Sequence, residues 1–116
     1  MASAPTIASI QHAVAKHYSV TVAMLKEPRP TSKRGMNNWD ISRPRQVAMA
    51  LSVLLTNHSY PRIGHYFGGR DHATVRYANV VVAKRRREDP KLHNFMRRLT
   101  LELVHQSFSG PTGRMS

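Results

Sequence analysis

The sequence contains no cysteine, which excludes disulfide bonds and zinc sites built from thiolates. It has only six acidic residues against 18 lysines and arginines, so its formal net charge is +12 at pH 7. No apolar run approaches the ~20 residues of a membrane-spanning helix, and the first residues lack the basic and then apolar order of a secretion signal. We therefore expect a cytoplasmic protein, away from membranes, whose surface attracts a polyanion.

Motifs for catalysis and nucleotide binding are missing as well. No stretch fits Gly-x-x-x-x-Gly-Lys followed by Ser or Thr, so the chain has no such loop to hold a nucleoside triphosphate. The acidic residues form no convincing inward-facing pair, and no serine or cysteine nucleophile motif occurs. The sequence predicts a protein that is not an enzyme and needs no nucleotide and no cofactor.

Three histidines recur at seven-residue intervals and raise the question of a metal site: His58, His65 and His72. One continuous helix would be needed to align them, but Pro61 and the pair Gly68 and Gly69 interrupt it. No cysteine or clustered carboxylate completes a coordination shell. We expect no metal.

Helical periodicity runs through most of the chain, and no strand pattern or repeat occurs. Apolar residues three and four positions apart predict helices over residues 6–18, 21–25 and 42–56 and from Pro90 onward. Ser42 is the predicted N-cap of the central helix, with Pro44 in its first turn. The chain is predicted to form one all-α domain over residues 7–106, with a disordered N-terminus at 1–6 and a flexible tail at 107–116.

Residues 26–40 interrupt this pattern with two prolines, a glycine and four basic groups. They are predicted to form a mobile surface loop. Trp39, the only tryptophan, is expected to pin the loop onto the core, with stacking on a base as the alternative.

Residues 59–77 have the pattern of a helix-turn-helix. Ser59 can cap a first helix with Pro61 in its first turn, and Gly68 and Gly69 can adopt the positive φ of a tight turn. Asp71 can then cap a second helix. Near its start that helix carries side chains that suit base edges in the major groove, namely His72, Ala73, Thr74 and Arg76. Three apolar residues are expected to face inward: Val75, Ala78 and Val82.

The excess positive charge is concentrated in this part of the chain. From residue 43 to residue 98 there are twelve lysines and arginines and three acidic residues. Nucleic acid is therefore the favoured partner. The basic run Lys84–Arg87 suits the negative end of the second helix and also suits a phosphate, and both interpretations hold together.

Residues 43–51, 55–59, 63–64 and 67–75 together resemble the C-terminal DNA-binding domain, domain IV, of the bacterial replication initiator DnaA. The Gly-Gly-Arg-Asp-His stretch at 68–72 is the hallmark of that family, and the likeness covers roughly residues 7–103. The resemblance implies a six-helix, Trp-repressor-like fold containing a helix-turn-helix. It also implies binding, as a monomer on a single site, to a nine-base-pair element of double-stranded DNA, the DnaA box or a variant of it.

The resemblance assigns roles to individual residues. Arg43 matches the family arginine that enters the minor groove, where a narrow A·T-rich groove attracts a guanidinium. Asp71, His72 and Thr74 match the residues at the major-groove face, and Ala73 stands where the family usually has threonine. Arg45 is included in the predicted DNA-contacting set. The predicted phosphate contacts are Gln46, Tyr60, Pro61, Arg62, Arg70 and Arg76.

Other positions depart from the family pattern. Val53 replaces a residue that is often basic, and Arg76 replaces an aliphatic residue, so the phosphate contacts are expected to be rearranged. We expect a natural stand-alone protein that regulates replication initiation or transcription at the nucleoid without ATP. The alternative is a nonspecific nucleic-acid-binding or protein-interaction module.

Overall fold

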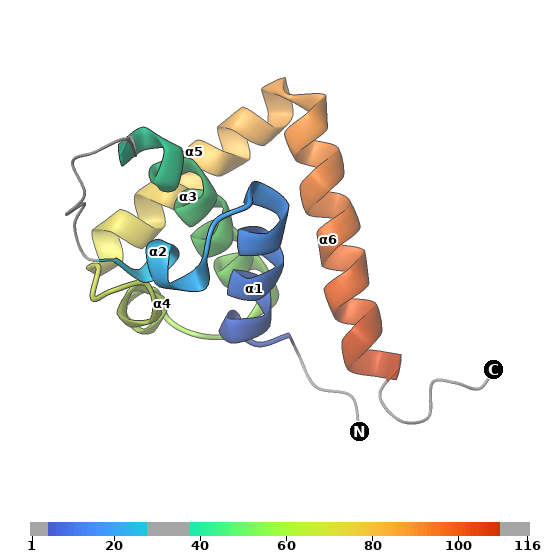
Figure 1. The fold of residues 1–116 in the computed structure, drawn as a ribbon, viewed down its shortest axis with the longest axis horizontal. Coiled ribbons are helices and arrows are strands. Elements are labelled where there is room, and N and C mark those ends of the chain that lie inside the picture. Colours follow the sequence, from blue (N-terminus) through green and yellow to red (C-terminus); the bar gives the residue numbers. More distant parts are fainter. Residues whose placement is uncertain (1–4, 28–37, 110–116) are drawn as a thin grey trace.

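A computed structural model of the chain describes residues 5–27 and 38–109, with side chains described at 5–27 and 41–105. Within these ranges the chain forms six helices and no strand, as predicted (Figure 1). The helices are α1 (Ile7–Tyr18), α2 (Val22–Lys26), α3 (Asn38–Leu55), α4 (Tyr60–Tyr66), α5 (His72–Glu88) and α6 (Pro90–Ser109). None of the helices in the described ranges is both long and apolar enough to span a bilayer.

Helix α3 lies at the centre and contacts all five other helices. Its apolar side chains at steps of three and four point into the core, where Val47, Ala48 and Leu51 are at most 1% exposed. Ser52 is also buried, and its hydroxyl donates to the carbonyl oxygen of Ala48 at 2.8 Å, so burial leaves no unpaired hydroxyl donor. The prediction of a central helix is confirmed.

The first helix is capped locally. The Thr6 hydroxyl accepts from the Ser9 backbone N–H at 3.0 Å, and the Ser9 hydroxyl accepts from the Thr6 N–H at 3.2 Å, which forms a capping box. Thr6 is thus part of the folded domain, although the predicted boundary assigned it to a disordered segment. The N-cap predicted at Thr21 is confirmed, since its hydroxyl accepts from the Met24 N–H at 3.0 Å.

The predicted start of the central helix is wrong. Helix α3 begins at Asn38, four residues before Ser42, so Ser42 is not its N-cap and Pro44 lies inside the helix. A proline there has no N–H to donate to the carbonyl four residues back, and its ring crowds that carbonyl, so the first turns of α3 lack one backbone bond. Ile41 is 7% exposed, which gives the added turn an apolar anchor. Residues 28–37 of the predicted loop and the side chain of Trp39 lie outside the described residues.

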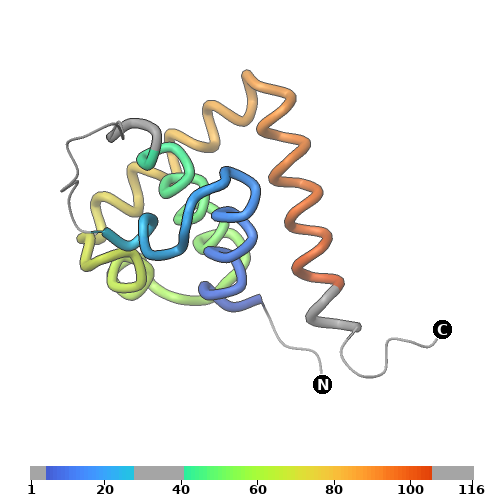
Figure 2. The backbone as a smooth tube through the Cα atoms, in the orientation of Figure 1, coloured from blue at the N-terminus to red at the C-terminus, as the bar shows by residue number. Residues whose placement is uncertain are grey.

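Helix α6 follows α5 with almost no linker. Asp89 Oδ1 accepts from the Lys91 N–H at 3.0 Å, as expected of a residue that precedes a proline-started helix. The chain turns sharply there and α6 returns past α1 (Figure 2). Five predicted core residues are buried: Leu92, Phe95, Met96, Leu99 and Leu103. The helix continues to Ser109, three residues into the predicted tail.

Candidate nucleic-acid interface

The turn between α4 and α5 depends on three glycines. Ser59 caps α4, as predicted, and Gly68 and Gly69 have φ values of 87° and 79°. The carbonyl oxygen of Gly64 accepts from the N–H groups of Phe67, Gly69 and Arg70 at 3.0, 3.1 and 3.0 Å. A Cβ at Gly64 would overlap the carbonyl of Arg70. Gly64 therefore permits the close approach of the two helices.

The role of Gly64 in the turn was not predicted from the sequence. The available signal was a glycine inside an otherwise helical pattern, which points to close packing. The turn glycines at 68 and 69 were easier to recognise because tandem glycines mark turns in any context.

Asp71 caps α5. Its Oδ1 atom accepts from both the backbone N–H and the hydroxyl of Thr74, each at 3.0 Å. The N–H and hydroxyl bonds from Thr74 are the main reasons that the pKa of Asp71 lies below its ordinary value. The predicted cap is confirmed, and it holds the first turn of α5 in a fixed conformation.

Acid is expected to weaken the fold of the wild-type chain more than that of an Asp71→Asn variant. A pKa lowered by folding means that the charged cap stabilises the fold above the ordinary value of 3.8, and that this stabilisation is lost as pH falls through the folded pKa. Asparagine also caps helices but does not titrate. Urea unfolding of both proteins from neutral pH to about pH 2 checks this. A constant difference in unfolding free energy over that range would contradict it.

The first turn of α5 is open to solvent. His72, Ala73, Thr74 and Arg76 are exposed. On the opposite side Val75, Ala78 and Val82 are at most 1% exposed, so their predicted inward direction is confirmed. The helix therefore holds a polar and methyl-bearing edge at the surface by burying its apolar edge.

Two arginines of the predicted DNA-contacting set bind the end of α2 instead of pointing freely outward. Arg45 donates to the carbonyl oxygens of Leu25 at 3.0 Å, through Nε, and of Met24 at 3.2 Å, through Nη2. Arg70 Nη2 donates to the Glu27 carbonyl oxygen at 2.8 Å. Burial, and then the nearby Arg70, lower the pKa of Arg45 to about 10, so it stays charged at neutral pH. The two cations complement the negative end of α2 and attach it to α3 and to the turn before α5.

Arg43 belongs to α3 and lies near the C-terminal end of α5, whereas Asp71 lies at the start of α5. Arg43 is exposed and lines a pocket together with Tyr18, Arg85, Asp89 and Lys91, where the ends of four helices meet. Gln46 is on the same side, because Arg85 Nη2 donates to its Oε1 at 3.4 Å. Arg85 is about 21 Å beyond Asp71, at about 1.5 Å of rise per residue. The two predicted groove readers therefore lie near opposite ends of α5.

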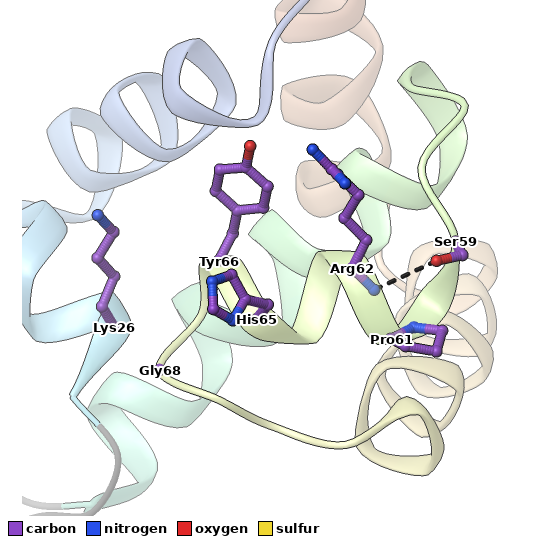
Figure 3. A pocket seen from close by; sticks show the side chains of 7 residues that line it. All are labelled: Lys26, Ser59, Pro61, Arg62, His65, Tyr66 and Gly68. Carbon is purple, nitrogen blue, oxygen red and sulfur yellow. Dashed lines mark hydrogen bonds between the residues drawn. The ribbon is translucent and has the colours of Figure 1, made fainter.

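A second pocket is formed by α2 and α4 (Figure 3). It is lined by Lys26, Ser59, Pro61, Arg62, His65, Tyr66 and Gly68, with two permanent cations and no carboxylate. Arg62 and Tyr66 point to the same side of α4, and Lys26 extends from the end of α2 beside Tyr66. Pro61 and Arg62 were predicted phosphate contacts, whereas Tyr60 is half-buried and packs against the core. Lys26 was not predicted, because only the folded chain brings it to α4.

The three histidines at seven-residue intervals, His58, His65 and His72, do not form a metal-binding group. The His58 ring lies near the ring of Tyr66, with centroids 6.1 Å apart, and the His65 ring also lies near it, with centroids 6.3 Å apart. Across residues 5–27 and 38–109, no group of three or more histidine, aspartate or glutamate side chains lies close enough to hold a metal ion.

Residues 7–82 match the model of the family described as "Bacterial dnaA protein helix-turn-helix", a range that includes α1 to α4 and most of α5. The chain belongs to the bacterial DnaA helix-turn-helix family. It is 45% identical over 84 residues to the chromosomal replication initiator protein DnaA of Psychromonas ingrahamii. That stretch is 72% of this chain and 17% of the relative, so the chain corresponds to a small part of the length of that DnaA protein.

Membership of the DnaA family confirms the resemblance seen in the sequence. The domain is a DNA-binding helix-turn-helix domain, and the family is not a catalytic one. Helix α4 and helix α5 are the two helices of the motif, with α5 in the position of the recognition helix. Helix α6 begins at Pro90, beyond the residues 7–82 that match the family model.

Proposed function

We propose that the chain binds double-stranded DNA sequence-specifically, with the first turn of α5 in the major groove of a DnaA-box-like element. The observation that carries this proposal is the capped, rigid and exposed turn from Asp71 to Thr74. The carboxylate of Asp71 can accept from cytosine N4, and the imidazole of His72 can meet a base or a phosphate. The Thr74 hydroxyl is already bonded to Asp71, so Thr74 offers its methyl group to thymine.

Arg43 is proposed to enter the neighbouring minor groove. Successive major and minor grooves lie about half a helical turn apart, or about 17 Å. The distance of about 21 Å along α5 between Asp71 and the neighbourhood of Arg43 supports simultaneous contact with both grooves. A guanidinium there would favour a narrow, A·T-rich minor groove.

Phosphate contacts are proposed on both sides of the recognition turn. Arg76 is exposed on α5, and the α2–α4 pocket adds Lys26, Pro61 and Arg62. Cations of this kind fix the position of the duplex without reading its sequence. Arg45 and Arg70 are proposed to act mainly by holding α2 against this surface, and Gln46 by holding Arg85.

The role in the cell is proposed from the same chemistry. Because no Gly-x-x-x-x-Gly-Lys loop occurs in the chain, we propose that it occupies initiator-like sites without ATP. It would act at the nucleoid, as a monomer on one site, in the control of replication initiation or of transcription. Mapping selected sites onto the source genome separates these roles, since sites near an origin indicate replication and sites at promoters indicate transcription.

Substituting the two groove readers tests the proposal directly. A duplex is first selected from a random library by the wild-type chain, and affinities for it and for a scrambled duplex are then compared. His72→Ala and Arg43→Ala are each expected to reduce the discrimination between these duplexes by about 1 to 3 kcal/mol. Arg97→Ala is the control, because it removes an exposed cation from α6.

The outcome also distinguishes the alternative function. Equal losses on selected and scrambled duplexes would reject base reading and favour a nonspecific nucleic-acid-binding module. Failure of the wild-type chain to enrich any duplex would favour a protein-interaction module.

A further inference from the structure

Helix α5 exposes a continuous stripe of side chains beyond its first turn. Ala73, Tyr77, Val80, Lys84 and Arg87 follow one another at steps of four, three, four and three, which places them on one face of the helix. All five are exposed, opposite the buried Val75, Ala78 and Val82. Tyr77 is 62% exposed and Val80 is 61% exposed, although both carry large apolar groups.

We propose that α5 lies along the major groove over its first three turns, so that Tyr77 and Val80 read base pairs beyond those met by Asp71 to Thr74. The ligand groups are the C5-methyl groups of thymines. This inference rests on the proposed DNA-binding function and extends it to two residues that neither the family match nor the sequence analysis assigned.

The dimensions of helix and groove are compatible with this arrangement. An α-helix with side chains is about 10 to 12 Å across, and the major groove is about 12 Å wide. Val80 lies about 14 Å along α5 from Asp71, at about 1.5 Å per residue. The rise along the duplex axis is about 3.4 Å per base pair, and the groove is inclined to that axis, so this distance along the groove covers about two to four base pairs. Tyr77 and Val80 would therefore meet bases that the first turn does not reach.

The chemistry of the two side chains identifies thymine. Val80 has no polar side-chain atom, so contact with an exposed base donor or acceptor would bury that group without a partner. The C5-methyl of thymine is the apolar group on the base edges of the major groove. The ring of Tyr77 offers a second apolar surface, and its hydroxyl at the far end of the ring can donate to an acceptor or a phosphate.

The rest of the stripe favours DNA over a protein partner. Lys84 and Arg87 follow Val80 on the same face and are exposed, and Arg76 borders the stripe near Tyr77. A straight helix leaves a curved groove after a few turns and then meets the sugar-phosphate backbone. Apolar groups bordered by cations match a groove bordered by phosphates.

The test compares thymine with uracil, which lacks only the C5-methyl group. Each thymine of the duplex selected by the wild-type chain is replaced in turn by deoxyuridine, and affinities are measured for the wild-type chain and for Tyr77→Ala and Val80→Ala. We expect the wild-type chain to lose about fourfold in affinity at one or two positions outside those affected by His72→Ala, the value of one buried methyl group. Each alanine variant is expected to bind the thymine and the uracil duplex equally well at the one position that its missing side chain would contact.

Two further variants keep the result interpretable. Tyr77→Phe retains the ring and is expected to retain the uracil penalty. Leu101→Ala removes an apolar side chain that is 59% exposed on α6, and it is expected to leave every penalty unchanged. Because all of these side chains are exposed, thermal unfolding should show that each variant is folded.

Unchanged uracil penalties in both Tyr77→Ala and Val80→Ala, with discrimination still lost in His72→Ala, would overturn this inference and leave the proposed function standing. A wild-type chain with no preference for any duplex would overturn the proposed function itself.

Discussion

Gly64→Ala is expected to lower the free energy of unfolding by about 3 kcal/mol or more, and to abolish specific DNA binding with it. The added Cβ would overlap the carbonyl group of Arg70, which belongs to the backbone and has no rotamer through which to escape. Relief would require α5 to move away from α4. That movement would also disturb the three N–H groups that share the Gly64 carbonyl oxygen. Urea denaturation followed by circular dichroism measures the loss.

Gly69→Ala is the matched control for this substitution. It adds the same methyl group in the same turn, and no atom lies within 4 Å of the new Cβ, but φ at Gly69 is +79°. The expected cost of Gly69→Ala is therefore that of an alanine in the left-handed backbone conformation, about 1 to 2 kcal/mol. If Gly64→Ala were no more destabilising than Gly69→Ala, the close approach of α4 and α5 at Gly64 would not be rigid.

Arg45→Met is expected to lower the free energy of unfolding by about 1 to 2 kcal/mol, because the part-buried Leu25 carbonyl oxygen loses the Arg45 donor and the Met24 carbonyl oxygen keeps only the N–H of Glu27. Methionine preserves much of the apolar stem but cannot donate to the carbonyl oxygens of Met24 and Leu25. The end of α2 would then lose its side-chain hydrogen bonds to α3. Urea unfolding measures the change in stability, and titration of DNA at a temperature where the variant is folded measures binding.

Arg76→Met is the control for Arg45→Met, because Arg76 is an exposed arginine on α5. It is expected to weaken DNA binding and to leave stability nearly unchanged. The opposite pattern, with a stable Arg45→Met protein that binds DNA poorly, would contradict the structural role of Arg45 and restore it as a direct DNA contact.

The parts of the fold that were predictable from sequence depend on local chemistry. Ser59, Asp71 and Thr21 were recognised as caps because an N-cap side chain bonds a backbone group two or three residues away. The start of α3 was misplaced because Ser42 and Pro44 also fit a helix start. Only the added turn, with Ile41 buried, distinguishes the two possibilities.

The unpredicted parts of the candidate site depend on contacts between distant residues. Arg45 meets Leu25 across 20 positions, and Arg70 meets Glu27 across 43. A basic residue near a helix-turn-helix suggests a phosphate contact, and no periodicity reveals that a carbonyl group from another helix already engages it. The same limit applies to Arg43, whose nearness to Arg85 and Lys91 follows from where α5 and α6 meet.

The course of α6 has a practical consequence for studying this domain. Figure 1 shows the start of α5 and the last turn of α6 at opposite ends of the long axis of the molecule. A fluorophore or an immobilisation handle placed on the last turn of α6 would therefore sit well away from the proposed DNA contact at Asp71. Labelled protein of that design should report association rates free of interference from the dye.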